Sequence, residues 1–502
     1  MLPSLRIQYL KDLFWRGRTK ALLLVLVFCF FSFSSAGWAL VATEESVEAD
    51  QIRKSLLDIA TKLKLKKSEV SFALDVPGVG LVSHRSNELM IPASTMKVVV
   101  AAAALDLLGP DFSLMTDLVA DGAVEDGVLQ GNLRIVGRGD PAIVGREDTE
   151  DVLWELRPWI GLIKDQGISS IAGKILADVR YFSGPGFHTD WPSGSAQQWY
   201  YAPSGALNLN DNCLDLIVGP VSGDRVQLEM RPFQPLASIV NRLKPVSDSK
   251  KHLIRMDRKG MSWEVVVSGS FLAKSGPQKF HVSVPDPASN FIGAFSQILS
   301  ESGLTITGGE YSDSVESRVL ARISHTLKSR LPVLLKNSQN LYADSIFRII
   351  GKEKGHKGDF LTAGKVIREW SGDRFPNSQP LVFRDGSGLS RKNRLTTAFL
   401  QQLMKWSLEC DWGDQLFTSL AVSGVDGTLK KRLKSNSVRG KILAKTGTLT
   451  GVSSLTGLLQ GEGSGEMMTF AFICNRKQGS ASVARQWQDR ALELLSKRFS
   501  GN

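Results

Sequence analysis

Cysteine and histidine are scarce in this chain of 502 residues, which contains four cysteines and six histidines. No two cysteines stand in a CxxC pair and no HExxH motif occurs, so the sequence gives no support to a zinc site. The histidines form no recognisable set, which argues against a Ser-His-Asp triad. We therefore expect a chemistry that needs no histidine, no metal ion and no other cofactor.

Long apolar runs are equally rare, and the one that stands out is ALLLVLVFCFFSF at residues 21–33. A basic segment precedes it and small residues follow, which is the order of a secretory signal. We expect residues 1–42 to form a signal peptide, cleaved after Ala39 or Ala42. An uncleaved anchor is the alternative, because residues 38–41 lengthen the apolar stretch toward a membrane span. Both interpretations predict export to the periplasm or cell envelope, with membrane contact through this N-terminus or at the periphery.

The three remaining cysteines and the net charge exclude few classes of function. One disulfide could form among Cys213, Cys410 and Cys474 in an oxidising compartment, although three cysteines cannot all pair; we expect buried free thiols. The formal net charge is +11, and residues 1–20 contribute +4 of it. The remainder is a mild excess for so long a chain. It predicts a solvated basic surface, gives weak support to attraction by an anionic envelope, and does not indicate a nucleic-acid partner.

The hydrophobic pattern changes twice along the chain, which is too long for one typical core. Helical spacing at 50–64 precedes two short strands, and a strongly apolar helix is expected at 95–108. From 116 to 314, short β-like runs dominate, with one helix near 149–166. Expected strands in that stretch include 171–177, 214–218, 226–230, 263–268 and 280–284. Beyond it we expect helices at 339–351, 360–370, 396–409 and 482–499, and strands at 441–446, 452–459 and 467–474.

These changes predict an α/β layer that is split by an insertion. Residues 43–115 and 315–502 are expected to form the layer, which would be one catalytic domain. Residues 116–314 are expected to form a β-rich insertion, either as one domain or as two nested domains.

The segment Ser94-Thr95-Met96-Lys97 stands at the start of the apolar helix. Positions i and i+3 share one helix face, with Cβ atoms about 5–6 Å apart, so the lysine can reach the serine hydroxyl. Burial beside the apolar run would lower the pKa of Lys97 and let the neutral amine accept a proton. The free N–H groups at the helix start suit a developing oxyanion. The alternative is a capping serine with a solvated lysine; a second SxxK, at 247–250, has no apolar helix after it.

Two further short motifs follow in the chain. Ser338-Gln339-Asn340 begins the helical pattern at 339–351, where simple helix capping is the alternative role. Lys445-Thr446-Gly447-Thr448 lies in a strand-like run, where a lysine and two hydroxyls can hold a carboxylate and Gly447 allows a close backbone approach. Its alternative is an ordinary polar strand end. Each motif alone is weak, but the order SxxK, SxN, KTG is far more specific.

This ordered set is similar to that of penicillin-binding proteins and serine β-lactamases. More narrowly, the chain resembles the D-alanyl-D-alanine carboxypeptidase/endopeptidase family of low-molecular-mass penicillin-binding proteins with a large insertion (class C, peptidase S13). Ser94 and Ser338 are 244 positions apart, which leaves room for that insertion. Gln339 departs modestly from the family, which has Asp or Asn there more often. Further matching segments are Gly137–Ile143, Tyr201–Asn212, Asp385–Leu389 and Gly424–Leu429.

The resemblance implies an α/β fold, a serine β-lactamase/transpeptidase-like α/β/α sandwich interrupted by the β-rich insertion. It implies a serine-type D-Ala-D-Ala carboxypeptidase that acts on peptidoglycan stem peptides and is acylated by β-lactams. Ser94 would form the acyl-enzyme and Lys97 would accept its proton. Ser338 would relay a proton to the leaving D-alanine, and Asn340 would orient the substrate amide.

The same resemblance assigns substrate binding to the third motif. Lys445, with Thr446 and Thr448, would hold the terminal carboxylate beside Gly447. The backbone N–H groups of Ser94 and Thr448 would form the oxyanion hole, where each donor is worth about 2.7–4 kcal/mol. Endopeptidase activity on crosslinks remains open beside the carboxypeptidase. A β-lactamase on the same scaffold and a non-catalytic envelope-binding protein are the two alternative functions.

Overall fold

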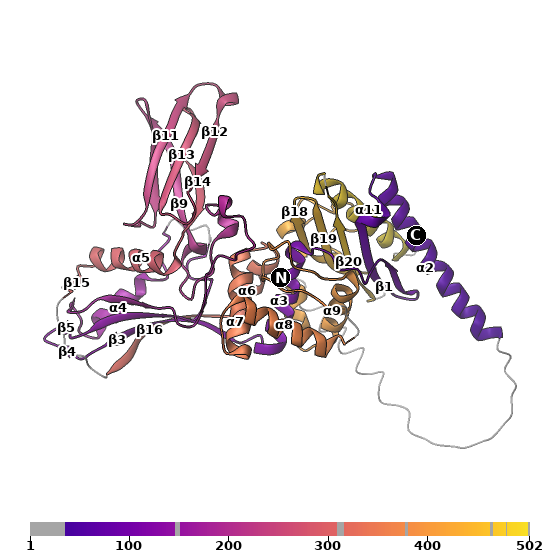
Figure 1. The fold of residues 1–502 in the computed structure, drawn as a ribbon, viewed down its shortest axis with the longest axis horizontal. Helices are drawn as coiled ribbons and strands as arrows, with labels where there is room; N and C mark the ends of the chain where they lie inside the picture. The colour runs from indigo at the N-terminus through magenta and orange to yellow at the C-terminus, as the bar shows by residue number, and fades with distance from the viewer. Residues whose placement is uncertain are drawn as a thin grey trace, which may run out of the picture.

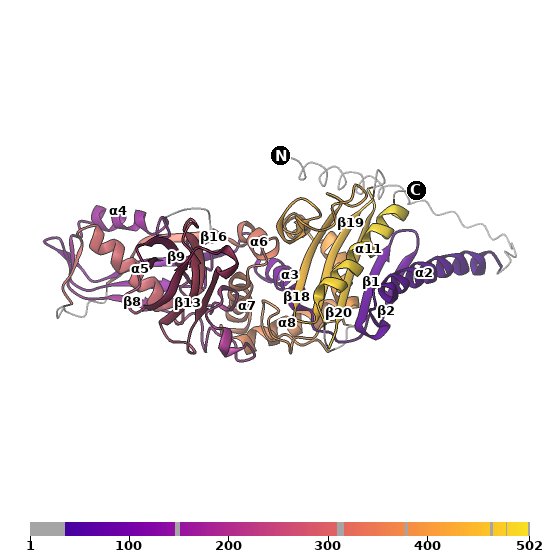
Figure 2. The same ribbon diagram turned by 90° about the horizontal axis from the view of Figure 1, so that it is seen from above.

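The computed structural model describes residues 36–145, 151–308, 316–376, 380–461, 465–477 and 479–499. Within these ranges the molecule is elongated, with a sheet flanked by helices at one end and a group of smaller sheets at the other (Figures 1 and 2). No helix in the described ranges is both long and apolar enough to cross a bilayer. The signal or anchor predicted for residues 1–42 lies mostly outside the described residues.

A six-stranded antiparallel sheet organises the first end of the molecule, in the order β17-β18-β19-β20-β1-β2. Its strands are β1 (Val70–Val76), β2 (Gly80–His84), β17 (Ala421–Val422), β18 (Ile442–Leu449), β19 (Val452–Gln460) and β20 (Met467–Asn475). The first eight residues of β19 are all buried. A strand buried on both faces requires cover on both sides of the sheet.

Helices supply that cover, as Figure 1 shows. On one face, α2 (Ala36–Lys62) and α11 (Ala481–Phe499) pack through Leu56 and Trp487 against the strands. On the other face, α3 (Met96–Leu108) is buried along its first ten residues. It lies within a helical layer, which explains its lack of a polar side. The other helices of that layer are α6 (Leu327–Leu335), α7 (Asn340–Gly355), α8 (Phe360–Arg374), α9 (Thr397–Glu409) and α10 (Gly413–Thr418).

Two small four-stranded sheets continue the chain after α3, in the orders β16-β3-β6-β8 and β15-β7-β5-β4. Together with α4 (Arg157–Asp165) and α5 (Pro287–Glu301) they enclose a hydrophobic core of their own, which includes Trp159 and Phe295. The strands are β3 (Ser113–Asp121), β4 (Val124–Glu125), β5 (Val128–Leu129), β6 (Asn132–Gly137), β7 (Ser170–Ile171), β8 (Ile175–Asp178), β15 (Thr305–Ile306) and β16 (Ser317–Thr326).

A further pair of three-stranded sheets projects from this region, and we call residues 213–283 the outer lobe (Figure 1). Their orders are β10-β9-β14 and β11-β13-β12, and the inner faces share a core that contains Val267 and Phe271. The strands are β9 (Cys213–Ser222), β10 (Arg225–Arg231), β11 (Ser238–Val246), β12 (Leu253–Asp257), β13 (Glu264–Leu272) and β14 (Gln278–Ser283).

Most expected elements are confirmed, including the apolar helix and the three C-terminal strands. Two expectations were wrong in extent. The single strand at 171–177 is two strands, β7 and β8, which belong to different sheets. The helix near 149–166 is the shorter α4, because residues 152–156 form turns. Pattern analysis also missed α5, α6, α10, β11 and β12. Of the three expected free thiols, Cys213 and Cys474 are buried and Cys410 is half-buried.

Candidate active site

The serine of the first motif lies in a 3₁₀ turn, Ala93–Thr95, directly before α3. Two hydroxyls anchor this turn by donating to the carbonyl of Pro92, Thr95 Oγ1 at 2.7 Å and Ser454 Oγ at 2.5 Å. The second comes from β19, so the turn is tied to the large sheet. The half-buried hydroxyl of Ser94 therefore stands where the helix layer meets the sheet.

Lys97 is fully buried, and its amine has three oxygen acceptors. The Nζ atom lies 3.0 Å from Ser94 Oγ, 2.7 Å from Asn340 Oδ1 and 2.7 Å from the carbonyl oxygen of Ser387. These three partners come from the turn before α3, from α7 and from the loop before α9. The predicted pair Ser94–Lys97 is thus in hydrogen-bond contact, with the amine held by the two other segments.

Burial lowers the pKa of Lys97 to about 8, although the carboxylates of Asp344 and Asp385 act in the opposite direction. Burial and the nearby charge of Lys97 also lower the pKa of Lys445 well below its ordinary value. Two buried amines in one site oppose each other's protonation. This electrostatic setting makes a neutral lysine accessible near physiological pH.

Two buried carboxyl groups stand behind Lys97. Asp344 Oδ1 accepts hydrogen bonds from the backbone N–H groups of Gly386 and Ser387, at 2.8 and 2.9 Å. Asp385 accepts from four donors, including Trp191 Nε1 at 2.8 Å. Burial, followed by the charge of Asp385, raises the pKa of Asp344. These contacts set the loop that presents the Ser387 carbonyl to Lys97.

The second motif is brought to the same place by the start of α7. Ser338 has a positive φ of 60°, and its Oγ accepts a hydrogen bond from Lys445 Nζ at 2.9 Å. Asn340 is the first residue of α7 and joins the site through Lys97. Gln339 turns away from both, and its Nε2 donates to Asp211 Oδ2 at 2.6 Å. Ser338 and Asn340 therefore reach the site, whereas the residue between them contacts the insertion.

The third motif lies on β18, beside the 3₁₀ turn. Lys445 is fully buried and also donates to the carbonyl of Thr446 at 2.7 Å, while Thr446 Oγ1 lies 2.9 Å from Thr428 Oγ1. Thr448 is exposed, on the open side of the strand.

A Cβ atom on Gly447 would lie 2.9 Å from the backbone nitrogen of Ser94 and 2.2 Å from Ser454 Oγ. Close packing of β18 against the serine turn thus requires a glycine at this position.

The insertion also contributes to this region, which sequence analysis did not foresee. Asn340 Nδ2 donates to the backbone carbonyl of Tyr200 at 2.8 Å, and Asp211 holds Gln339. Asp344 was likewise not singled out, and Ser387 appeared only within the matching segment Asp385–Leu389. Asp344 carried a usable signal, because it stands four positions after Asn340 on one helix face within an apolar stretch. The contact with Tyr200 had no such signal.

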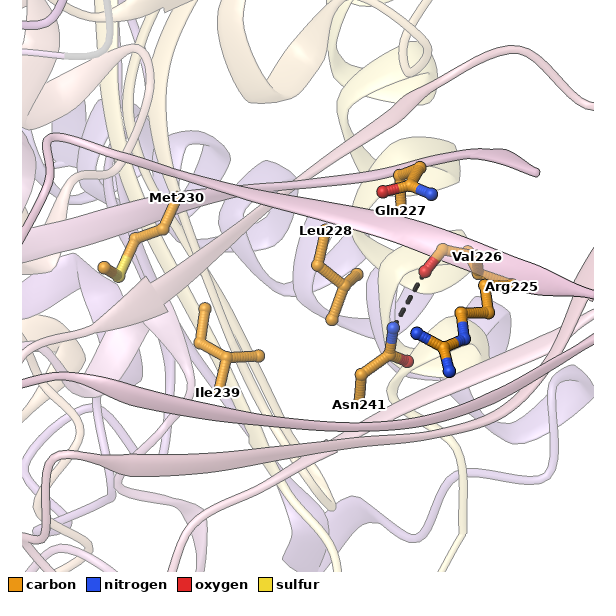
Figure 3. Close-up of a pocket in the computed structure, with 7 residues that line it drawn as sticks. All are labelled: Arg225, Val226, Gln227, Leu228, Met230, Ile239 and Asn241. Carbon is orange, nitrogen blue, oxygen red and sulfur yellow. Dashed lines mark hydrogen bonds between the residues drawn. The ribbon is translucent and has the colours of Figure 1, made fainter. Parts of the chain in front are cut away.

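Two other segments with similar sequence motifs lie in the outer lobe, apart from the cluster around Ser94, Lys97, Ser338 and Lys445. Residues 247–250 and Lys274 are in exposed turns of the outer lobe. A cleft between β10 and β11 is lined by Arg225, Val226, Gln227, Leu228, Met230, Ile239 and Asn241, and it shares no residue with the Ser94 cluster (Figure 3). In the described part of the chain, no group of three or more His, Cys, Asp or Glu side chains is placed to hold a metal ion.

Comparison with known proteins adds to this geometry. The model of the D-Ala-D-Ala carboxypeptidase 3 (S13) family matches residues 52–497. A D-alanyl-D-alanine carboxypeptidase from Actinomadura sp. is 30% identical over 82% of this chain and 78% of the relative. The carboxypeptidase DacB of Haemophilus influenzae is 25% identical over 79% and 82%. The crystal structure of penicillin-binding protein 4 from H. influenzae has a TM-score of 0.74 at 22% identity, over 89% and 99% of the two chains, which is a likeness of fold.

Proposed function

Because this chain belongs to the D-Ala-D-Ala carboxypeptidase 3 (S13) family, we propose that Ser94 is the nucleophile of its reaction. The protein is a serine-type D-Ala-D-Ala carboxypeptidase, a hydrolase of the penicillin-binding protein class. The observation that carries the residue assignment is the contact of Lys97 Nζ with Ser94 Oγ at 3.0 Å, in a buried setting that favours the neutral amine.

Acylation begins with the neutral amine of Lys97. As Ser94 Oγ attacks the carbonyl carbon between the two D-alanines, its proton passes to Lys97 Nζ. The backbone N–H groups of Ser94 and Thr448 face the developing oxyanion, since the strand passes the turn at Gly447. The acyl–nitrogen bond then breaks and leaves an ester on Ser94. Attack by water on that ester releases the shortened peptide and restores the hydroxyl.

The leaving D-alanine needs a proton on its nitrogen and a cation for its carboxylate. Ser338, whose Oγ accepts a hydrogen bond from Lys445 Nζ, relays to the leaving group's nitrogen the proton that Lys97 took from Ser94, and so leaves Lys97 neutral again. Lys445, whose ammonium form the bound anion stabilises, holds the terminal carboxylate together with the hydroxyls of Thr446 and Thr448. Asn340, whose amide bridges Lys97 and the Tyr200 carbonyl, orients the scissile amide.

The substrate and location follow from the same assignment. We propose that the substrates are peptidoglycan stem peptides ending in D-Ala-D-Ala, with crosslinks as a second substrate of the same site, and that β-lactams acylate Ser94. Export to the periplasm is the corresponding location. The sequence predicted a catalytic domain of residues 43–115 and 315–502. We propose the narrower bounds 43–112 and 327–502, and the pairing of β16 with β3 supports assigning residues 317–326 to the insertion. The separate cores of the insertion favour two nested domains.

Labelled penicillin tests the nucleophile directly. The wild-type protein should take up one covalent label, and Ser94→Ala should take up none while retaining its unfolding midpoint. Mass analysis of a pentapeptide incubated with each protein should show loss of one alanine with the wild type alone. Persistent labelling or alanine release by Ser94→Ala would overturn the assignment.

A further inference from the structure

Outside residues 1–20, the net positive charge of this protein is concentrated in the outer lobe, residues 213–283. Between positions 213 and 283 the sequence has eleven Lys or Arg and six Asp or Glu, a net charge of +5. Residues 1–20 supply another +4 of the total of +11, which leaves +2 for all the rest of the chain. The outer lobe, about one-seventh of the residues, therefore carries most of the excess positive charge that lies outside residues 1–20. The sequence predicted a basic surface, but the charge is not spread evenly over it.

The excess lies at one end of the lobe. The end of β14 is fixed to the body of the molecule, since Ser283 N donates to the carbonyl of Gln197. Near this base, four cations face four carboxylates, and Lys279 and Arg231 are ion-paired with Asp215 and Glu229. From the middle of the lobe to its far tip there are seven cations and two carboxylates, Asp224 and Asp248. The seven are Arg225, Arg242, Lys244, Lys250, Lys251, Arg255 and Lys274.

The strand register aligns several of these cations on one open sheet face. Ser268 of β13 pairs with Arg242 of β11 on one side and with Arg255 of β12 on the other. In the next row, Ser270 lies between Lys244 and Leu253. The two arginines are thus two strand spacings apart, about 9–10 Å, on the face opposite the core. They form a flat cationic face that continues into the lysines of the tip.

This surface is solvent-exposed. All seven cations are exposed, and no ion pair joins any of them to a carboxylate within the described residues. Only Arg225 lines the cleft between β10 and β11, in which Asn241 Nδ2 donates to the Val226 carbonyl at 2.8 Å (Figure 3). The other six lie on the open face of the β11-β13-β12 sheet and in the turns at the end of the lobe. Leu253, 50% exposed, stands among them.

We propose that the tip of the outer lobe docks on a bilayer surface rich in anionic phospholipid. A planar anionic surface can contact cations on an open sheet face and in the turns beside it at once, whereas a polymer chain is better held by a groove. Leu253 supplies an apolar side chain that can enter the boundary between headgroups and acyl chains. The lobe projects from the body (Figure 1). Its longest strand, β9, has 10 residues and so spans on the order of 30 Å. Docking therefore leaves the Ser94 site free, and the proposal does not depend on the assigned chemistry.

Vesicle flotation of the purified full-length protein tests the docking surface. Vesicles containing phosphatidylglycerol should bind the protein, vesicles of phosphatidylcholine alone should not, and high salt should release it. A variant that neutralises the cationic face of the β11-β13-β12 sheet through Arg242→Gln, Lys244→Gln and Arg255→Gln should partition roughly a hundred-fold less onto the anionic vesicles.

A matched control removes the same charge from the catalytic body through Lys354→Gln, Lys365→Gln and Arg368→Gln, and should partition like the wild type. Unfolding midpoints of both variants should match the wild type, which keeps misfolding apart from lost docking. Equal losses in both variants would attribute binding to net charge and overturn the proposal. Failure to bind anionic vesicles, with binding instead to soluble polyglutamate or teichoic acid, would overturn it as well.

Discussion

Asp344 fixes the position of Ser387, and Ser387 in turn holds Lys97. The carboxylate accepts the Ser387 N–H at 2.9 Å, and the Ser387 carbonyl accepts from Lys97 Nζ at 2.7 Å. Asp344 is therefore a positioning residue with two separable effects on the lysine. One effect is geometric and acts through the loop, and the other is the electrostatic effect of its charge.

The first prediction separates these effects. Asp344→Asn keeps an oxygen that can accept the loop N–H groups but removes the charge, so the pKa of Lys97 should fall. The acidic limb of β-lactam acylation should move to lower pH, by up to about one unit. Asp344→Ala removes the acceptor and should slow acylation at every pH. Stopped-flow acylation rates measured across pH would distinguish the geometric effect from the electrostatic one. A shift of the acidic limb to higher pH in Asp344→Asn would contradict the electrostatic role.

A second prediction concerns the wild-type pH profile. The pKa of Lys97 lies at about 8, and the neutral amine is the form that accepts the Ser94 proton. Acylation should therefore rise about ten-fold per pH unit below that value and level off above it. The fully buried amine would be replaced by an apolar chain in Lys97→Met, which should lower the rate by about 10²–10⁴-fold. A flat profile between pH 6 and pH 9 would exclude the lysine as base.

The third prediction concerns Gly447 and the packing of β18. In Gly447→Ala the new methyl group would meet Ser454 Oγ and the Ser94 nitrogen, so the strand must move away from the turn. We expect a loss of about 1–3 kcal/mol in unfolding free energy and slower acylation. Gly276→Ala is the matched control, because open space surrounds its Cβ position. Denaturant unfolding of the two proteins makes the comparison, and equal stability would refute the packing argument.

The fourth prediction concerns Gln339, where the family more often has Asp or Asn. Its side chain donates to Asp211 across the boundary with the insertion, so Gln339→Asp would place two carboxylates together. The variant should lose about 1–2 kcal/mol of stability at neutral pH and recover part of it in acid, where one carboxyl is protonated. Gln339→Asn, which keeps a donor, should lose less. Thermal unfolding at two pH values measures both, and a pH-independent loss would point to packing alone.

Much of the fold was predictable because it follows from local periodicity. The apolar run predicted a helix at 95–108, which the structure buries along its first ten residues. The alternation of strands and turns predicted an insertion rich in β-structure. The elements that were missed are less regular. Helix α6 has buried leucines at helical spacing, but Pro332 in its middle is a residue that normally breaks a helix. Strand β12 has no fully buried residue, so its alternation is weak.

The sequence by itself determined the pairing of Ser94 with Lys97, because a spacing of three residues puts both side chains on one helical face. Only the tertiary structure decided that Asn340, Ser387 and Lys445 would meet that pair. These residues lie more than 240 positions after Lys97 in the chain, and they reach it because α3, α7 and β18 bury their apolar surfaces against one another. Backbone periodicity acts over a few residues, whereas the buried electrostatic environment of Lys97 depends on which distant segments pack around it.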